Sequence, residues 1–136
     1  GEIVIPPTSS GTSVVRSTSY PNYDGYYIKP VNGRKSQGLH GYNAVDIAAP
    51  YGTPIVAAAS GVVIISRATG WNGGYGGYVV ISHNNGTQTL YAHMSSDIVS
   101  VGDVVQQGQV IGYVGSTGRS TGPHLHIEVR GARNPF

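Results

Sequence analysis

The stretch Gly77-Tyr-Val-Val-Ile-Ser-His-Asn-Asn-Gly-Thr-Gln-Thr-Leu-Tyr-Ala-His-Met94 decides the fold. Two runs rich in Val, Ile, Thr and Tyr flank the pair Asn85-Gly86. Asn-Gly is the strongest short signal for a two-residue hairpin turn, because both residues tolerate a positive φ. We therefore predict an antiparallel hairpin with strands at residues 77–83 and 87–94.

Short apolar runs separated by turns continue on both sides of this hairpin. The chain has 21 Gly residues, and no segment has the 3.6-residue periodicity of an amphipathic helix. The pattern predicts an all-β fold with little helix, built as an antiparallel β-sheet or sandwich. The further strands are predicted at residues 27–29, 45–47, 54–57, 61–68, 103–105, 110–114 and 124–130.

The segment Val101–Gly115 has the form short strand, Gly turn, short strand, and it resembles half of a lipoyl/biotinyl barrel-sandwich domain. This supports a sheet related to the barrel-sandwich hybrid. Such carrier domains hold a modified Lys at a hairpin tip. The Lys residues of this chain are Lys29 and Lys35, and neither lies in a comparable turn. A carrier function is therefore disfavoured.

Composition changes near residue 26. Residues 1–26 are rich in Ser, Thr, Pro, Gly and Tyr, and we predict a linker or extended N-terminal segment there. Within it, Ile3–Ile5 is a candidate edge strand. Residues 27–136 are predicted to form one domain. Because the chain begins at Gly1 rather than Met, we expect it to be part of a longer protein.

The bulk numbers exclude several functional classes. The net charge is +2 without any run of Lys or Arg, which disfavours nucleic-acid binding. There is no Cys, which excludes thiolate metal sites, thiol nucleophiles and disulfides. No apolar run approaches the roughly 20 residues of a membrane span. Any metal must therefore be held by His and carboxylate side chains.

The sharpest chemical signal is the strand-like motif His124-Leu-His126. Residues two apart in a strand point to the same face, so both imidazoles enter one pocket while Leu125 and Ile127 pack on the other side. Two adjacent imidazoles indicate a metal or a shared water. The alternative is a surface strand with two incidental His residues.

The segment His40-Gly-Tyr-Asn-Ala-Val-Asp46 supplies further candidate ligands. Asp46 lies among Ala, Val and Ile, and burying an ionised carboxylate is costly unless it is paired or bound to a metal. The alternative is an Asp that accepts backbone amides of the following turn. Catalytic zinc commonly takes three His or carboxylate ligands and leaves one position open. The residues alone do not say which His residues are ligands and which are acid/base groups.

The remaining two His residues lie on the predicted hairpin. His93 shares a predicted strand face with Tyr91, which points it across the pocket from His124 and His126. His83 stands at a strand end before the turn, and we interpret it as a surface residue of the hairpin.

Four blocks of the sequence together carry a resemblance to a known family. They are H-G-Y-N-A-V-D-I-A-A-P-Y-G-T-P-I (40–55), Y-A-H-M (91–94), V-G-D-V-V-Q-Q-G-Q-V-I-G (101–112) and G-S-T-G-R-S-T-G-P-H-L-H-I-E-V-R (115–130). In this order they resemble the lysostaphin-like zinc metallopeptidases, which are peptidoglycan endopeptidases. The resemblance covers residues 27–130.

The resemblance implies a role for each matching residue. One Zn²⁺ would be bound by His40, Asp46 and His126, and His93 and His124 would be the catalytic pair. The implied function is hydrolysis of peptide cross-links or cross-bridges of peptidoglycan by metal-activated water. The family usually has four residues from the first His to the Asp, whereas this chain has six, and we expect a small bulge to absorb the difference.

The resemblance also implies the partners and the location. We expect a monomer that acts on stem peptides or cross-bridges outside the cytoplasm, as a secreted, periplasmic or wall-associated protein. The bond cleaved, glycyl-glycine or D-alanyl-diamino acid, stays open. The alternative is a catalytically inactive wall-binding or activator module of the same fold, but the presence of all five matching residues favours an enzyme.

Two Gly-rich segments are candidates for the walls of a substrate groove. They are residues 70–77 and 116–122, and the alternative for both is a flexible hairpin tip. The candidate groove residues are Tyr42, Asn43, Trp71, Tyr75, Tyr91, Ser116 and Thr117.

Overall fold

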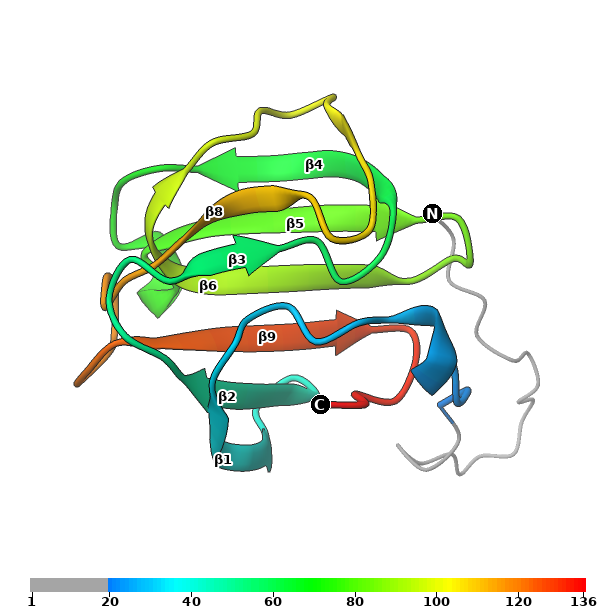
Figure 1. The fold of residues 1–136 in the computed structure, drawn as a ribbon, viewed down its shortest axis with the longest axis horizontal. Coiled ribbons are helices and arrows are strands. Elements are labelled where there is room, and N and C mark those ends of the chain that lie inside the picture. The colour runs from blue at the N-terminus through cyan, green and yellow to red at the C-terminus, as the bar shows by residue number, and fades with distance from the viewer. Residues whose placement is uncertain (1–19) are drawn as a thin grey trace.

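The computed structural model describes residues 20–136, which form a nine-stranded antiparallel sheet with two short 3-10 helices (Figure 1). None of the helices in this part of the chain is both long and apolar enough to cross a membrane. The elements are η3 Asp24–Tyr26, β1 Arg34–His40, β2 Ala44–Ala48, β3 Pro54–Val56, β4 Gly61–Arg67, η4 Asn72–Gly74, β5 Gly77–His83, β6 Gln88–Asp97, β7 Val104–Val105, β8 Val110–Val114 and β9 His124–Arg130.

The hairpin around Asn85-Gly86 is the centre of the sheet. β5 and β6 pair as predicted, and the strands run in the order β1-β2-β9-β6-β5-β4-β7. β3 pairs with β8, and β8 also pairs with β6, so this second layer lies over β5 and β6 (Figure 1). The all-β prediction is confirmed.

One apolar cluster fills the space between the two layers. Alternate residues of β2 and β9, such as Ile47, Leu125 and Ile127, are buried in it together with Ile55 of β3 and Ile111 of β8. The period-2 alternation of the strands places their other residues on the opposite face. The core therefore leaves one face of β2 and β9 free for polar side chains, whereas on β5 and β6 a smaller apolar cluster of Val80, Leu90 and Ala92 covers part of that face.

β6 changes partner part-way along its length. Gln88–Ala92 pairs with β9, whereas Met94–Asp97 pairs with β8. The β5–β6 register shifts between Gly77 and Val79, and opposite that shift lies His93, a non-Gly residue with φ +63°. A bulge re-aims a side chain and bends a strand. Here the bulge turns His93 towards the polar face.

The first strands differ from the prediction in two ways. Residues 27–29 form no strand: the Tyr27 amide bonds back to Asp24 O, the Ile28 amide bonds to Ala58 O, and Pro30, which has no N–H, follows. Conversely, β1 was not predicted, because it is exposed along six of its seven residues and has no apolar alternation. Its backbone pairing with β2, not its side chains, makes it a strand.

The segment before Tyr27 contacts the C-terminal end of the domain. Arg133 donates its backbone N–H to Pro21 O at 2.9 Å, and its guanidinium pairs with both oxygens of Asp24 at 3.0 Å. The candidate strand Ile3–Ile5 lies outside the described residues. The predicted boundary after residue 26 stays a prediction.

His83 is not a surface residue, contrary to prediction. It is 3% exposed, with Nδ1 2.8 Å from Ser60 O and Nε2 2.8 Å from Thr89 Oγ1. The Thr89 hydroxyl continues to Tyr91 Oη at 2.7 Å, and Tyr91 Oη accepts the Ala58 amide. This buried chain joins the β5–β6 hairpin to the loop after β3, and burial lowers the pKa of His83.

Candidate metal centre and active site

Strand register brings the candidate site residues into one row. Asp46 of β2 lies opposite His126 of β9, and His126 lies opposite Ala92 of β6, the neighbour of His93. His124 lies opposite Ala48 on the same face. The row runs across three neighbouring strands on the face away from the core, so the sheet itself fixes the spacing of these side chains.

His40 reaches this row from the end of β1. The chain turns back through Gly41 and Asn43, both with positive φ, and the register shifts between Gln37 and His40. The side-chain amide of Asn43 donates to Val129 O at 2.8 Å, which anchors the turn to β9. The six-residue spacing is thus taken up by a hairpin turn together with a bulge in β1.

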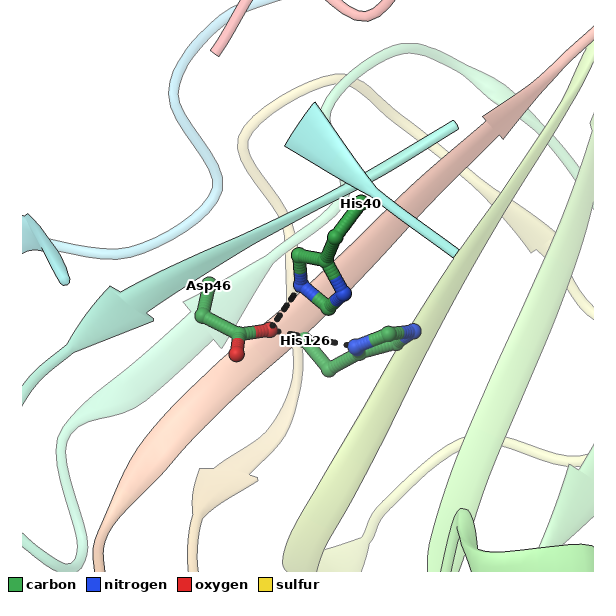
Figure 2. A group of neighbouring side chains, drawn as sticks. All are labelled: His40, Asp46 and His126. Carbon is green, nitrogen blue, oxygen red and sulfur yellow. Dashed lines mark hydrogen bonds and ion pairs between the residues drawn. The ribbon is translucent and has the colours of Figure 1, made fainter. Parts of the chain in front are cut away.

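His40, Asp46 and His126 form a compact cluster (Figure 2). Nε2 of His40 and Nδ1 of His126 each lie 3.1 Å from Asp46 Oδ1. Ligand atoms about 2.0–2.1 Å from a tetrahedral ion are about 3.3 Å apart, so these separations suit one metal ion. Nε2 of His40 is buried, and its 3.1 Å contact with Asp46 Oδ1 lacks the geometry of a hydrogen bond, so within residues 20–136 its lone pair or proton has no hydrogen-bond partner, as expected of a ligand atom.

The charges of the cluster also suit a cation. Burial raises the pKa of Asp46, but interactions with His126, His124 and His40 outweigh it and lower that pKa overall. Burial lowers the pKa of His126, but the Asp46 and Glu128 carboxylates outweigh it and raise that pKa to about 9. Two carboxylates thus favour positive charge at this point, from a proton or from a metal ion.

His93 and His124 have a different environment from the cluster. Nδ1 of His93 lies 2.6 Å from Thr117 O, and Nδ1 of His124 lies 2.9 Å from Gly122 O. A carbonyl only accepts, so each Nδ1 carries the proton and each Nε2 is left as an acceptor. Their ring centroids are 4.7 Å apart, and Nε2 of His124 is 3.9 Å from Asp46 Oδ2. Burial lowers the pKa of His93, which favours its neutral form.

A cavity of about 360 Å³ holds all five of these residues. A second cavity, of about 670 Å³, shares His40 and extends over the turn that follows β1. The first is lined by His40, Asp46, Gly73, Gly74, Tyr75, His93, Arg119, Ser120, Thr121, His124 and His126. The second is lined by Tyr20, Leu39, His40, Gly41, Tyr42, Asn43, Val129, Arg130 and Gly131.

The candidate groove residues are distributed unevenly around these cavities. Tyr75 lines the first cavity, and Tyr42 and Asn43 line the second. Trp71 is 56% exposed and lies under the Arg119 guanidinium, 5.6 Å from it.

Four groove predictions do not match the cavities: Trp71, Tyr91, Ser116 and Thr117 line neither of them. Tyr91 is fully buried in the core, because the bulge at His93 breaks the alternation that placed the two on one face. Ser116 and Thr117 line neither cavity; Thr117 instead donates its hydroxyl to Met94 O at 2.8 Å. Ser120 and Thr121, a few residues on, line the first cavity in their place.

The two Gly-rich segments are packed against each other. The Arg119 amide donates to Gly74 O at 2.7 Å, and the Gly77 amide donates to the Thr117 hydroxyl at 3.1 Å. A Cβ on Gly118 would lie 2.4 Å from both Gly74 O and Gly76 N. Glycine is therefore required at the contact, and together the segments form one wall of the first cavity.

Glu128 is a site residue that the sequence motifs did not point to. It is 1% exposed and lies on the same strand face as His124 and His126. The same alternation that paired the two His residues would have placed Glu128 beside them.

Comparison with known proteins agrees with this arrangement. The model of peptidase family M23 matches residues 40–136, which include all five site residues. The chain belongs to peptidase family M23. The matched region begins at His40, the first residue of the cluster that could hold a metal ion, and the fold and the resemblance predicted above are confirmed.

Two curated relatives illustrate the similarity. The DD-carboxypeptidase/endopeptidase Mpg of Neisseria meningitidis is 54% identical over 106 residues, which are 78% of this chain and 23% of the relative. The peptidoglycan DD-endopeptidase ShyA of Vibrio cholerae is 44% identical over 109 residues, 79% of this chain and 24% of the relative. The chain thus spans about a quarter of the length of these relatives.

Solved structures show the same fold. Lysostaphin from Staphylococcus simulans has a TM-score of 0.64 at 39% identity, over 71% of this chain and 41% of that chain. A zinc-containing peptidase from Vibrio cholerae has a TM-score of 0.60 at 36% identity, over 82% of this chain and 35% of that chain.

Proposed function

We propose that this chain is the catalytic domain of a zinc-dependent endopeptidase that hydrolyses peptide bonds in bacterial peptidoglycan. One observation carries the proposal: two imidazole nitrogens lie 3.1 Å from a shared Asp46 oxygen, and two further imidazoles line the same cavity. The names of the relatives Mpg and ShyA give the reaction class. Because peptidoglycan lies outside the cytoplasmic membrane, we expect the domain to act there.

The donor set favours zinc over harder cations. His40 and His126 offer nitrogen and Asp46 offers oxygen, a combination typical of catalytic zinc sites, whereas magnesium and calcium prefer oxygen alone. When bound, zinc would act as a Lewis acid on a carbonyl and lower the pKa of coordinated water. The cluster shares its cavity with His93 and His124.

His93 and His124 are the proton-transfer groups in this proposal. Their Nδ1–H groups are held by carbonyls of Thr117 and Gly122, which leaves each Nε2 to accept a proton and to return it. In its protonated form either ring becomes a cation that stabilises a developing oxyanion. His93 suits the accepting role because burial lowers its pKa and keeps the ring neutral near pH 7.

The bond we propose is the D,D cross-link between D-alanine and a diamino acid. The two relatives named for DD activity are 54% and 44% identical to this chain, compared with 39% for the lysostaphin structure. Mass spectrometry of digests from two wall types tests the choice. Fragments released from directly cross-linked walls, but not from glycine-bridged walls, are expected.

Three variants test the mechanism. His124→Ala is expected to abolish release of labelled wall fragments while keeping about one zinc per chain, whereas Asp46→Ala loses both. Tyr51→Ala, at an exposed position outside both cavities, is the control and keeps both. Loss of zinc by His124→Ala would contradict the ligand assignment. Full activity of Asp46→Ala without zinc would contradict the proposed function.

A further inference from the structure

Glu128 is a buried carboxylate with four hydrogen-bond donors around it. Oε2 lies 3.0 Å from His126 Nε2 and 2.5 Å from the Tyr75 hydroxyl, and Oε1 lies 3.2 Å and 2.9 Å from Nε and Nη2 of Arg130. A charge buried to this degree is costly unless its oxygens are fully paired. The proposed mechanism gives Glu128 no role, so its place beside the metal cluster requires an explanation.

We propose that Glu128 is a positioning residue that fixes the tautomer and the orientation of His126, which rests on the proposed function of the cluster as a metal site. An ionised carboxylate only accepts hydrogen bonds, so His126 Nε2 must carry a proton. The lone pair of the neutral ring is then on Nδ1, the atom that lies 3.1 Å from Asp46 Oδ1. A carboxylate behind a metal-binding His is a recurrent way to orient the ring.

Arg130 and Tyr75 hold Glu128 in the required rotation. Arg130 engages Oε1 through two nitrogens, so the carboxylate cannot turn without breaking both bonds. Tyr75 donates to Oε2, and its own backbone carbonyl accepts the His93 amide at 2.8 Å. Tyr75 thus links the orientation of a proposed ligand, His126, to that of a proposed catalytic residue, His93.

An isosteric substitution separates this role from simple packing. In Glu128→Gln the amide has one oxygen and one NH2 group, and Arg130 offers only donors. The amide oxygen must therefore face Arg130, and the NH2 group faces Tyr75 and His126. His126 Nε2 then has to accept, which moves the ring proton to Nδ1, the proposed metal-binding atom.

The test measures zinc affinity by competition with a chelator. Glu128→Gln is expected to bind zinc about 10–100-fold more weakly than wild type. Tyr51→Ala, at an exposed position outside both cavities, is the control and is expected to bind zinc as tightly as wild type. Wild-type affinity in Glu128→Gln would overturn the inference; failure of the wild type itself to bind zinc would instead overturn the proposed function.

A rescue experiment tests the tautomer directly. In the double variant Glu128→Gln/Arg130→Met the donor at Oε1 is gone, so the amide can turn its oxygen to His126. Zinc affinity is expected to recover most of the loss seen in Glu128→Gln. NMR of the zinc-loaded double variant with ¹⁵N-labelled His should show the proton on His126 Nε2, as in wild type. Absence of recovery, or a proton on Nδ1 of His126 in the zinc-loaded wild type, would overturn the inference.

A third variant applies if Glu128→Gln does not fold. Glu128→Asp keeps the charge beside Arg130, but its shorter side chain does not reach His126 Nε2. It is expected to bind zinc more weakly than wild type, with the circular dichroism spectrum unchanged. Wild-type affinity in this variant would also overturn the inference.

Discussion

The five His residues of this chain differ in what their ring nitrogens contact. His93 and His124 donate Nδ1–H to carbonyls, whereas His126 lies between two carboxylates. His40 has a buried nitrogen with no hydrogen bond among the described residues, and His83 is tied into the core. Identical side chains therefore take different chemical roles because their neighbours assign the ring protons.

His93 combines an unusual backbone with a proposed acid/base role. Its φ of +63° disfavours most residues, but Asn tolerates this conformation well. We predict that His93→Asn stays folded, keeps its zinc and loses about 10²–10⁴-fold in kcat, the typical contribution of a general acid/base group. Wall-fragment release and zinc content measure this.

The backbone provides the control for this prediction. His93→Ala should lose the same activity and in addition melt at a lower temperature, because Ala does not tolerate a positive φ as Asn does. Equal melting temperatures for the two variants would contradict the strain argument.

His83 should make stability depend on pH. Burial lowers its pKa below the ordinary 6.5, so below pH 6.5 the unfolded chain binds a proton that the folded chain does not. The contribution of His83 is complete above pH 6.5 and is lost as pH falls towards the folded-state pKa. We predict that the difference in free energy of unfolding between wild type and His83→Gln narrows from pH 7.5 to pH 5.

Urea titrations at several pH values measure this difference. Other titrating groups act equally on both proteins and cancel in the comparison. A difference that stays constant over this range would show that His83 does not titrate differently in the folded and unfolded states.

At the scale of elements, the wall made by residues 70–77 and 116–122 determines where His93 points. The wall holds together through glycine contacts that leave no space for a side chain, and it carries the Thr117 carbonyl that accepts the His93 Nδ1–H. A change in how the two segments pack should therefore act on catalysis as well as on stability.

Gly118→Ala tests this coupling. A Cβ there would lie 2.4 Å from Gly74 O and Gly76 N, so the two segments must separate. We predict a large loss of kcat together with a lower melting temperature. Gly73→Ala is the matched control: its φ of +67° resembles the +72° of Gly118, but nothing lies within 4 Å of its Cβ position. Gly73→Ala should lower the free energy of unfolding by only about 1–2 kcal/mol, from backbone strain, and leave kcat nearly unchanged. Equal losses of kcat in Gly73→Ala and Gly118→Ala would refute the coupling.

Sequence patterns predicted the elements where local signals are strong. Asn85-Gly86 marked the central hairpin, and alternation in β9 placed Leu125 and Ile127 in the core. Alternation failed at Tyr91 and His93, because a bulge depends on the pairing of β6 with its neighbours and leaves no mark in the sequence of β6 itself.

The candidate site was predictable as a set of residues but not as a set of roles. The structure brings all five predicted site residues to one cavity. The difference between His124 and His126 depends on the carbonyl of Gly122 and the carboxylate of Glu128, which lie beside the rings only after the chain has folded. The motif alone could not supply this information.

At the scale of the whole molecule, the proposed metal would join three strands. His40 is on β1, Asp46 on β2 and His126 on β9. An ion that binds only the folded chain stabilises it by mass action. We predict that zinc at 100 times its dissociation constant adds about 2.7 kcal/mol to the free energy of unfolding, and that a chelator removes this gain.

Calorimetry with and without zinc measures the gain. Asp46→Ala, which lacks the shared ligand, should melt at the same temperature in both conditions. A wild-type melting temperature that does not respond to zinc would contradict a metal bridge between the three strands.

The position of β1 has a kinetic consequence. β1 pairs only with β2 among the described strands, and its residues are mostly exposed, whereas Asp46 and His126 lie on strands with neighbours on both sides. Local opening of an outer hairpin requires less free energy than global unfolding. Release of His40 is therefore the easiest first step for a departing ion, and zinc should exchange with solution much faster than the domain unfolds.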